Sequence, residues 1–229
     1  FLWGLSDGIN DAGLSIALAY GGRQETGRGF GITTILRYVL ETCETVPQAL
    51  RVLQRVPSHM PYNVVVADAS GAGASVEMYA GGGAKVQPRL VATNHQTDGS
   101  TPDRGSFTRT FERSKHLVSV LSEGVTPSAL AGQFTQAPLK QDRYAEGFGT
   151  LFTAEYEPKR RKMTLHWDDE VWPQSIDAFE EGTRQVTYGS APSLVAAGGD
   201  INWVQIGLDY AAGRGVDWRR FVPAGVDVA

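Results

Sequence analysis

Apolar residues near the N-terminus recur at every second position, which is the period of a half-buried β-strand. Leu14, Ile16 and Leu18 follow this period. They come directly after the segment 8–13, which is rich in Asn, Asp and Gly, residue types that tolerate the positive φ angles of a tight turn. Residues 1–22 are therefore predicted to form two strands, paired as a hairpin with one buried face.

The apolar period then changes to that of a helix. The spacing predicts one helix over residues 33–43, with Thr33 or Thr34 as its N-cap. A second helix follows, because Thr45 has the side chain of an N-cap and Pro47 fits a first helical turn. The apolar positions of the two helices are Ile35, Leu36, Val39, Leu40, Ala49, Leu50, Val52 and Leu53.

Strand signals return in the middle of the chain. The β-branched run 62–68 ends in a turn at 68–71, and residues 74–79 are predicted to pair back as a hairpin. A further short strand is predicted at 89–93, and its last residues lead into a polar loop. Helical spacing of apolar residues then predicts a helix over 106–121.

The next part of the chain mixes the two periods. Thr126 and Pro127 open a short predicted helix. Residues 148–156 and 163–167 alternate well enough to form a strand pair, joined by a turn at 158–161.

The order of strands, helix pair, strands, helices and strands indicates a layered α+β domain rather than a βαβ repeat. We assign residues 1–179 to this core and residues 180–229 to a C-terminal extension and tail. Within the extension a helix is predicted at 201–212, and residues 223–229 are expected to form the tail.

Composition narrows the function classes. The chain has a formal net charge of −4, so a nucleic-acid partner is not expected. Its one dense basic run, Lys159–Lys162, is either an anion site or a solvated turn. The sequence has no apolar run of about 18 residues, so no membrane partner is expected. The single cysteine fits a reducing compartment, and we expect a soluble, cytoplasmic protein.

Several kinds of site are excluded by the sequence. The four histidines are scattered and the one cysteine offers no thiolate cluster, so no metal is expected. The glycine-rich segment 27–31 lacks the lysine of a phosphate-binding loop, and no Gly-x-Ser-x-Gly occurs. No cofactor is therefore predicted. Cys43 lies at the C-terminal end of a predicted helix between Glu41 and Glu44. This setting disfavours a thiolate, so we interpret Cys43 as structural.

Five segments in order resemble a known family. They are Gly8–Ile16, which has the pattern Gly-x-Asn-x-x-Gly-Leu, then Ile35–Ala49, Asn63–Asp68, Val91–His95 with its Thr-Asn-His, and Ser106–Arg109. Together they resemble the acyl-CoA:6-aminopenicillanic acid acyltransferases and the choloylglycine hydrolases, which are N-terminal nucleophile (Ntn) hydrolases. The resemblance covers roughly residues 1–170.

The resemblance implies a four-layer αββα sandwich, incomplete at its N-terminus in this chain. It also implies a cysteine that becomes N-terminal by autoproteolysis and uses its own α-amino group as the base. The expected activity is that of an amidohydrolase or an acyltransferase. Such an enzyme acts on a linear amide or an acyl thioester through an acyl-enzyme.

Site residues follow from the same resemblance. Asn94 matches the oxyanion-binding asparagine, although it is also placed to form only an Asx-turn after a strand. Arg109 matches an arginine near the nucleophile, with a surface position on a helix start as the alternative. Tyr20, His95 and Tyr62 are the candidate substrate-binding residues, while aromatic residues of this kind are more often part of the core.

Two departures from the family pattern leave alternatives open. Ala19 stands where related hydrolases have a second oxyanion asparagine. The nucleophile cysteine and its neighbouring aspartate should lie upstream of Phe1. The chain is therefore expected either to work with an N-terminal segment or partner chain that carries the cysteine, or to be a catalytically inactive member that binds a small acyl compound or assembles with partners. Exposed edges of glycine-rich hairpins favour a homo-oligomer.

Overall fold

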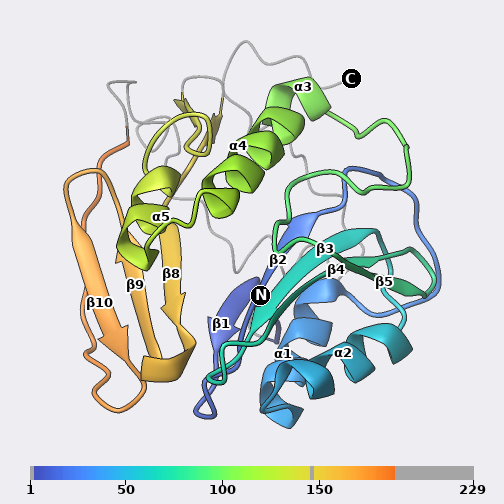
Figure 1. The fold of residues 1–229 in the computed structure, drawn as a ribbon, viewed down its shortest axis with the longest axis horizontal. Helices are drawn as coiled ribbons and strands as arrows, with labels where there is room; N and C mark the ends of the chain where they lie inside the picture. The colour runs from blue at the N-terminus through green and yellow to red at the C-terminus, as the bar shows by residue number, and fades with distance from the viewer. Residues whose placement is uncertain (1–2, 145–146, 189–229) are drawn as a thin grey trace, which may run out of the picture. The chain divides into compact units, whose positions relative to one another are not determined.

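A computed structural model describes residues 3–144 and 147–188 (Figure 1). The chain divides into two compact units, residues 1–142 with 148–186, and residues 143–147 with 187–229. Apart from Arg143, the helices and strands below belong to the first unit. The predicted helix at 201–212 and the tail at 223–229 lie outside the described residues.

The main sheet has five antiparallel strands in the order β1-β2-β3-β4-β5 (Figure 1). Their bounds are β1 Asp7–Ile9, β2 Ser15–Tyr20, β3 Tyr62–Ala67, β4 Gly73–Met78 and β5 Ala84–Gln87. The strand–turn–strand predicted for residues 1–22 is confirmed by the register, which pairs Gly8 with Ile16. The hairpin predicted around residues 68–71 is confirmed too, because Val64 pairs with Val76.

Helices α1 (Ile32–Thr42) and α2 (Val46–Arg55) cover one face of this sheet (Figure 1). The apolar side chains between them and the sheet form a continuous core, whose fully buried members include Leu14, Ile16, Ile35, Leu36, Val39, Leu53, Val64, Val66, Val76 and Met78. The period-two and helical patterns of the sequence therefore converge on one hydrophobic layer.

The N-cap prediction is confirmed for one of the two helices and wrong for the other. Helix α2 has the predicted N-cap Thr45, and Gln48 completes a capping box by accepting from the backbone N–H of Thr45 at 3.1 Å. Helix α1 begins at Ile32 with Gly31 as its N-cap and has no side-chain cap bond, so the prediction of Thr33 or Thr34 was wrong. Both threonines lie inside the first turn of the helix, past the N-cap position.

Asn10 explains the Gly-x-Asn-x-x-Gly pattern in physical terms. Its Oδ1 accepts from the backbone N–H of Leu14 at 2.8 Å and closes the β1–β2 turn. Its Nδ2 donates to the carbonyl oxygens of Leu40 at 3.0 Å and Cys43 at 2.7 Å, which satisfies the end of α1. The same turn needs Gly13, because it has φ +79° and a Cβ there would meet the carbonyl oxygen of Pro158 at 2.4 Å.

The rest of the first unit contains three further helices and a second sheet. The helices are α3 Gly105–Thr108, α4 Thr110–Ser122 and α5 Pro127–Phe134, and the second sheet has the order β10-β9-β8, with bounds β8 Thr153–Glu157, β9 Lys162–His166 and β10 Val171–Ser175. A short pair, β6 Asp142–Arg143 and β7 Phe148–Gly149, stands apart from both sheets. The described residues thus define an α+β protein with antiparallel sheets.

These elements refine the sequence predictions. The predicted helix 106–121 divides at Arg109, whose φ of +52° is left-handed and ends α3 before α4 begins. Thr126 caps α5 as predicted, accepting from the N–H of Ala129. The predicted strand 148–156 was wrong as one element, because β7 and β8 belong to different sheets.

The basic run Lys159–Lys162 forms the 3₁₀ turn η2 (Pro158–Arg160) and the start of β9, which is the predicted strand connection. Arg160 pairs with Glu157 at 3.1 Å and Arg161 with Asp177 at 2.6 Å. The charges of the basic run are therefore partly paired at the surface, as in a solvated turn. No helix among residues 3–144 and 147–188 combines the length and the hydropathy needed to span a bilayer.

Candidate active site

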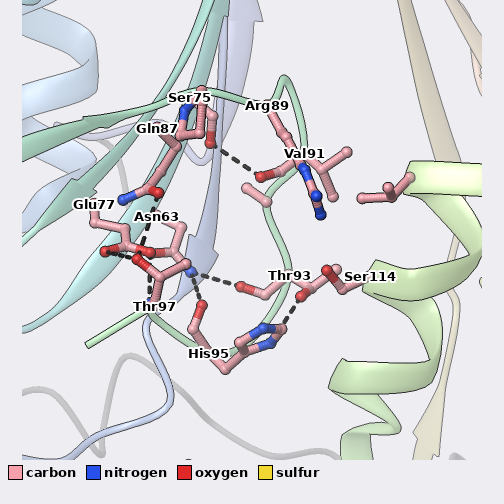
Figure 2. Close-up of a pocket in the computed structure, with 13 residues that line it drawn as sticks. Asn63, Ser75, Glu77, Gln87, Arg89, Val91, Thr93, His95, Thr97 and Ser114 are labelled. Atoms are coloured by element: carbon pink, nitrogen blue, oxygen red, sulfur yellow. Dashed lines mark hydrogen bonds between the residues drawn. The ribbon is translucent and has the colours of Figure 1, made fainter. Parts of the chain in front are cut away.

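The second face of the main sheet is polar. The register places Ala19, Asn63 and Glu77 side by side on neighbouring strands, and Ala17, Val65 and Ser75 in the next row on the same face. Asn63, Ser75 and Glu77 are nevertheless almost fully buried. What covers them is the irregular segment 91–97, shown with its contacts in Figure 2.

Side chains of β3 and β4 hold this segment in place. Ser75 Oγ donates to the carbonyl of Val91 at 3.1 Å, and Asn63 Nδ2 donates to the carbonyls of Thr93 at 2.6 Å and His95 at 2.8 Å (Figure 2). The prediction of a strand at 89–93 was therefore wrong. β5 ends before Pro88. In a strand, the carbonyls of this segment would accept from backbone N–H groups of a neighbouring strand, but here they accept from side chains.

Glu77 fixes the end of the segment. Its carboxylate accepts from the Thr97 backbone N–H at 2.7 Å, the Thr97 hydroxyl at 3.1 Å and the Tyr79 hydroxyl at 3.2 Å. A buried carboxylate with three donors is a stable arrangement, because its hydrogen bonds compensate for lost hydration. Gln96 adds a bond from its Nε2 to the carbonyl of Met78 at 2.9 Å.

Asn94 is held in one orientation from two sides. Arg113 Nη1 donates to its Oδ1 at 3.0 Å, and its Nδ2 donates to the carbonyl of Tyr20 at 3.4 Å. The second hydrogen on Nδ2 has no partner among the described residues. A fixed amide with one N–H left over has the donor that an oxyanion-binding residue needs.

Arg113 is the site residue that the sequence interpretation missed. The side chain of Arg109 instead bonds Glu112 through two nitrogens, at 2.8 and 2.6 Å, and is well exposed. Arg113 lies one helical turn further along α4, and burial lowers the pKa of its guanidinium, with the charge of Arg109 acting in the same direction. No local signal separates the two arginines, because Arg109 is the left-handed N-cap residue of α4 and only Arg113 lies within the helix.

His95 is packed beside Asn94 as part of the support. Its Nδ1 lies 2.8 Å from the Thr110 hydroxyl and 3.1 Å from that of Thr93, and its ring packs 4.5 Å from the ring of Phe111. Burial lowers the pKa of His95, an effect that the charge of Glu77 opposes. The imidazole is therefore neutral near pH 7 and acts in a hydrogen-bonded chain with two threonines.

The two predicted substrate-binding tyrosines contact each other. The rings of Tyr20 and Tyr62 pack edge to face at 6.2 Å, and the Tyr20 hydroxyl donates to Asp103 at 3.4 Å. Burial raises the pKa of Tyr20, and the charge of Asp103 adds to this. Only the backbone carbonyl of Tyr20 reaches Asn94.

Two cavities lie against the segment. The smaller, about 340 Å³, has polar and apolar walls in similar proportion and is lined by residues that include Asn63, Glu77 and His95 (Figure 2). The larger, about 820 Å³, is mainly apolar and extends over the sheet toward α4 and α5. Both are lined by Arg89, Val91, Ala92 and Val118. Within the described ranges no three His, Cys, Asp or Glu side chains are arranged to hold a metal ion.

An antiparallel α+β core that holds one fixed amide beside a partly buried arginine is suited to acyl transfer, in which negative charge develops on a carbonyl oxygen. Comparison with models of protein families identifies the family of this chain. The model of the acyl-coenzyme A:6-aminopenicillanic acid acyltransferases matches residues 1–172, and the chain belongs to this family. A search of curated proteins found no match.

Proposed function

We propose that this chain supplies the oxyanion donor and the substrate pocket of a cysteine Ntn amidohydrolase or acyltransferase with the four-layer αββα architecture. The observation that carries the proposal is the Asn94 amide, held by Arg113 at 3.0 Å with one N–H left for a ligand. Family membership supports acyl-transfer chemistry in general terms. The single free, buried cysteine supports a cytoplasmic setting.

The nucleophile of this proposal is a cysteine outside the present sequence, on an N-terminal segment or partner chain. Cys43 does not fit the role, because it is only 4% exposed and belongs to the core beneath α1 and α2. Its carbonyl is also occupied, accepting from Asn10 at 2.7 Å. A reacting thiolate needs an accessible position, which Cys43 lacks.

The proposed reaction has two halves. The cysteine thiolate, deprotonated by its own α-amino group, attacks an amide or thioester carbonyl, and Asn94 Nδ2–H stabilises the negative charge on the oxygen. The tetrahedral intermediate then collapses to an acyl-enzyme. An amide substrate loses its amine, which takes a proton from the protonated α-amino group, and a thioester substrate loses its own thiolate. In the second half, water or an amine gives up a proton to the same α-amino group and attacks the acyl-enzyme. This step breaks the thioester bond, releases the acid or a new amide, and returns the cysteine as a thiolate.

The test uses the full-length protein that carries the upstream cysteine. Asn94→Ala is expected to lower kcat by about 10²–10³-fold, because one oxyanion donor is removed. Lys115→Ala, an exposed substitution on α4, is the matched control and should leave kcat unchanged. An Asn94→Ala enzyme with the kcat of the parent would remove Asn94 from the site.

A second measurement separates hydrolase from acyltransferase. A free amine added to the reaction diverts product from acid to amide in an acyltransferase, whereas a hydrolase releases only the acid. A full-length protein with no reactive N-terminal cysteine would instead favour the catalytically inactive, small-molecule-binding alternative.

A further inference from the structure

The smaller cavity has a buried hydrogen-bond acceptor in its wall that no described residue serves. Asn63, one of the lining residues, is 3% exposed. Its Nδ2 donates to the carbonyls of Thr93 and His95, and these two bonds fix the orientation of the amide. Its Oδ1 is buried and has no hydrogen-bond partner within residues 3–144 and 147–188. An acceptor in this position is unfavourable unless a bound group completes it.

A buried carboxylate lies next to this acceptor. Glu77 is the register partner of Asn63 on β4 and is almost fully buried. The groups of Thr97 and Tyr79 that donate to it are neutral, so they stabilise the carboxylate without balancing its charge. No described Lys, Arg or His forms an ion pair with it, not even Lys85, its register partner on β5. Buried charges in proteins are normally paired or bound to a cation.

The hydrogens near this carboxylate are too few for the acceptors. Thr97 Oγ1 carries one hydrogen but lies 3.1 Å from Glu77 Oε2 and 3.4 Å from Gln87 Oε1. Rotating the Gln87 amide would let its unpartnered Nε2 donate to Thr97, but Oε1 would then take the buried position that has no partner. Either way, acceptors remain without donors. The side chains of this oxygen cluster all line the smaller cavity and lie together in Figure 2: Asn63, Glu77, Gln87 and Thr97.

The composition of the oxygen cluster favours a cation of single charge. Carboxylate, amide and hydroxyl oxygens are the ligands of hard cations. The cluster contains one carboxylate, so a divalent ion would leave a net positive charge in a buried place. Within the described ranges no three His, Cys, Asp or Glu side chains come together to hold such an ion. The cavity is also lined by Arg89, but Figure 2 shows this side chain directed toward α4, away from Glu77.

We propose that the oxygen cluster binds a monovalent alkali cation, Na⁺ or K⁺. The site goes beyond the proposed function, because it requires neither substrate nor nucleophile. Thr97 is exposed, which gives an ion a route from solvent. Asn63 and Glu77 both hold the segment 91–97, so the bound cation stabilises the segment that carries Asn94.

Thermal unfolding of the full-length protein tests the proposal without turnover. The protein is compared in NaCl, KCl and choline chloride at equal ionic strength, where choline reports the effect of screening alone. We expect Na⁺ or K⁺ to raise the unfolding midpoint in a saturable manner, by about 2–5 °C at tenfold the half-saturating concentration. The alkali ion that acts at the lower concentration is the ligand. Equal midpoints in all three salts would overturn the proposal.

Two variants assign the effect to the cluster. Glu77→Gln keeps the size of the side chain but removes its charge, and should abolish the alkali-specific rise. Glu44→Gln makes the same change at an exposed carboxylate and should leave the rise intact. If Glu77→Gln does not fold, Gln87→Glu provides the second variant. It adds a second carboxylate and should lower the half-saturating concentration about tenfold or more. A parental response in Gln87→Glu or in a folded Glu77→Gln would contradict the site.

A crystal structure of the full-length protein with Tl⁺ as the probe locates the ion. We expect an anomalous peak bounded by Asn63 Oδ1 and the Glu77 carboxylate. An ordered water there, with no anomalous signal, would overturn the proposal, because water would then supply the donor that Asn63 lacks. This result leaves the role of Asn94 untouched, since that role is tested by kcat alone.

Discussion

One face of the main sheet carries Ile16, Val64 and Val76 and packs against two helices, whereas the opposite face carries Asn63, Ser75 and Glu77 and lies under the segment 91–97. Both sets of side chains are almost completely buried. The first face is held by apolar contact, which depends on volume and tolerates changes of partner. The second is held by directed hydrogen bonds, each of which fixes one atom.

This difference between apolar packing and directed hydrogen bonds supports the location of the proposed site. Apolar packing does not distinguish between two orientations of an amide. Asn63, in contrast, holds the backbone carbonyls of Thr93 and His95, and Arg113 holds the side-chain oxygen of Asn94. The proposed site, which must place a single N–H donor, lies in the segment held by the polar face. Substitutions on the two faces should have different consequences for stability and for activity.

The largest effect on stability is expected on the apolar face. Leu36→Ala removes a fully buried side chain from the core of α1 and should lower the free energy of unfolding by about 2–5 kcal/mol. Chemical denaturation of the full-length protein measures it. The Michaelis constant of the protein that remains folded should be unchanged, and an altered Michaelis constant would contradict the separation of the faces.

The second-largest effect is expected on the polar face, where a substitution should lower both the stability and kcat. Asn63→Leu keeps the branched shape of the side chain but leaves the carbonyls of Thr93 and His95 without their donor. A cost of about 1–3 kcal/mol per unsatisfied buried group is expected, together with a loss of kcat, because the segment that carries Asn94 is released. Ser70→Ala, on the turn after β3, is a control that should leave kcat unchanged. A variant with the parental kcat would show that Asn94 does not depend on this support.

The sequence predicted the apolar face well and the polar face poorly. Alternation in β2 and the helical stripe of α1 are local signals, so the periodicity alone locates their buried residues. The cover of the polar face depends on contacts such as Ser75 to Val91 and Asn63 to Thr93, which join residues 16 and 30 positions apart. No local period encodes these contacts, and the segment was therefore predicted as a strand.

The same reasoning applies to the two arginines. The resemblance located Asn94 and Ser106–Arg109 by motif, but the left-handed break at Arg109 rotates the chain between α3 and α4. The side chain that contacts Asn94 is consequently Arg113. A motif reports which residues occur together, whereas the backbone angle at one position decides which of them faces the site.

A smaller effect is expected at the turn that joins β1 to β2. Asn10→Ala removes the cap of α1 and the closure of the β1–β2 turn, so the free energy of unfolding should fall by about 1–2 kcal/mol. Thermal denaturation followed by circular dichroism measures it. Asp11→Ala, at the exposed tip of the same turn, is the control, and equal losses for the two variants would contradict the capping role.

The smallest effect is a pH dependence at the edge of the apolar face. Burial raises the pKa of Asp68, but bonds from the Ser70 side chain and from backbone N–H groups, including that of Val46 at 2.8 Å, outweigh it and bring the pKa below its usual value of 3.8. A carboxyl whose folded-state pKa is depressed contributes stability above its unfolded pKa and loses it as the pH falls through the folded value. The difference in unfolding free energy between the parent and Asp68→Asn should therefore be constant near pH 7 and shrink below pH of about 4. A difference that stays constant down to the acid transition would mean that the ionised carboxylate is not what holds the start of α2 to the end of β3.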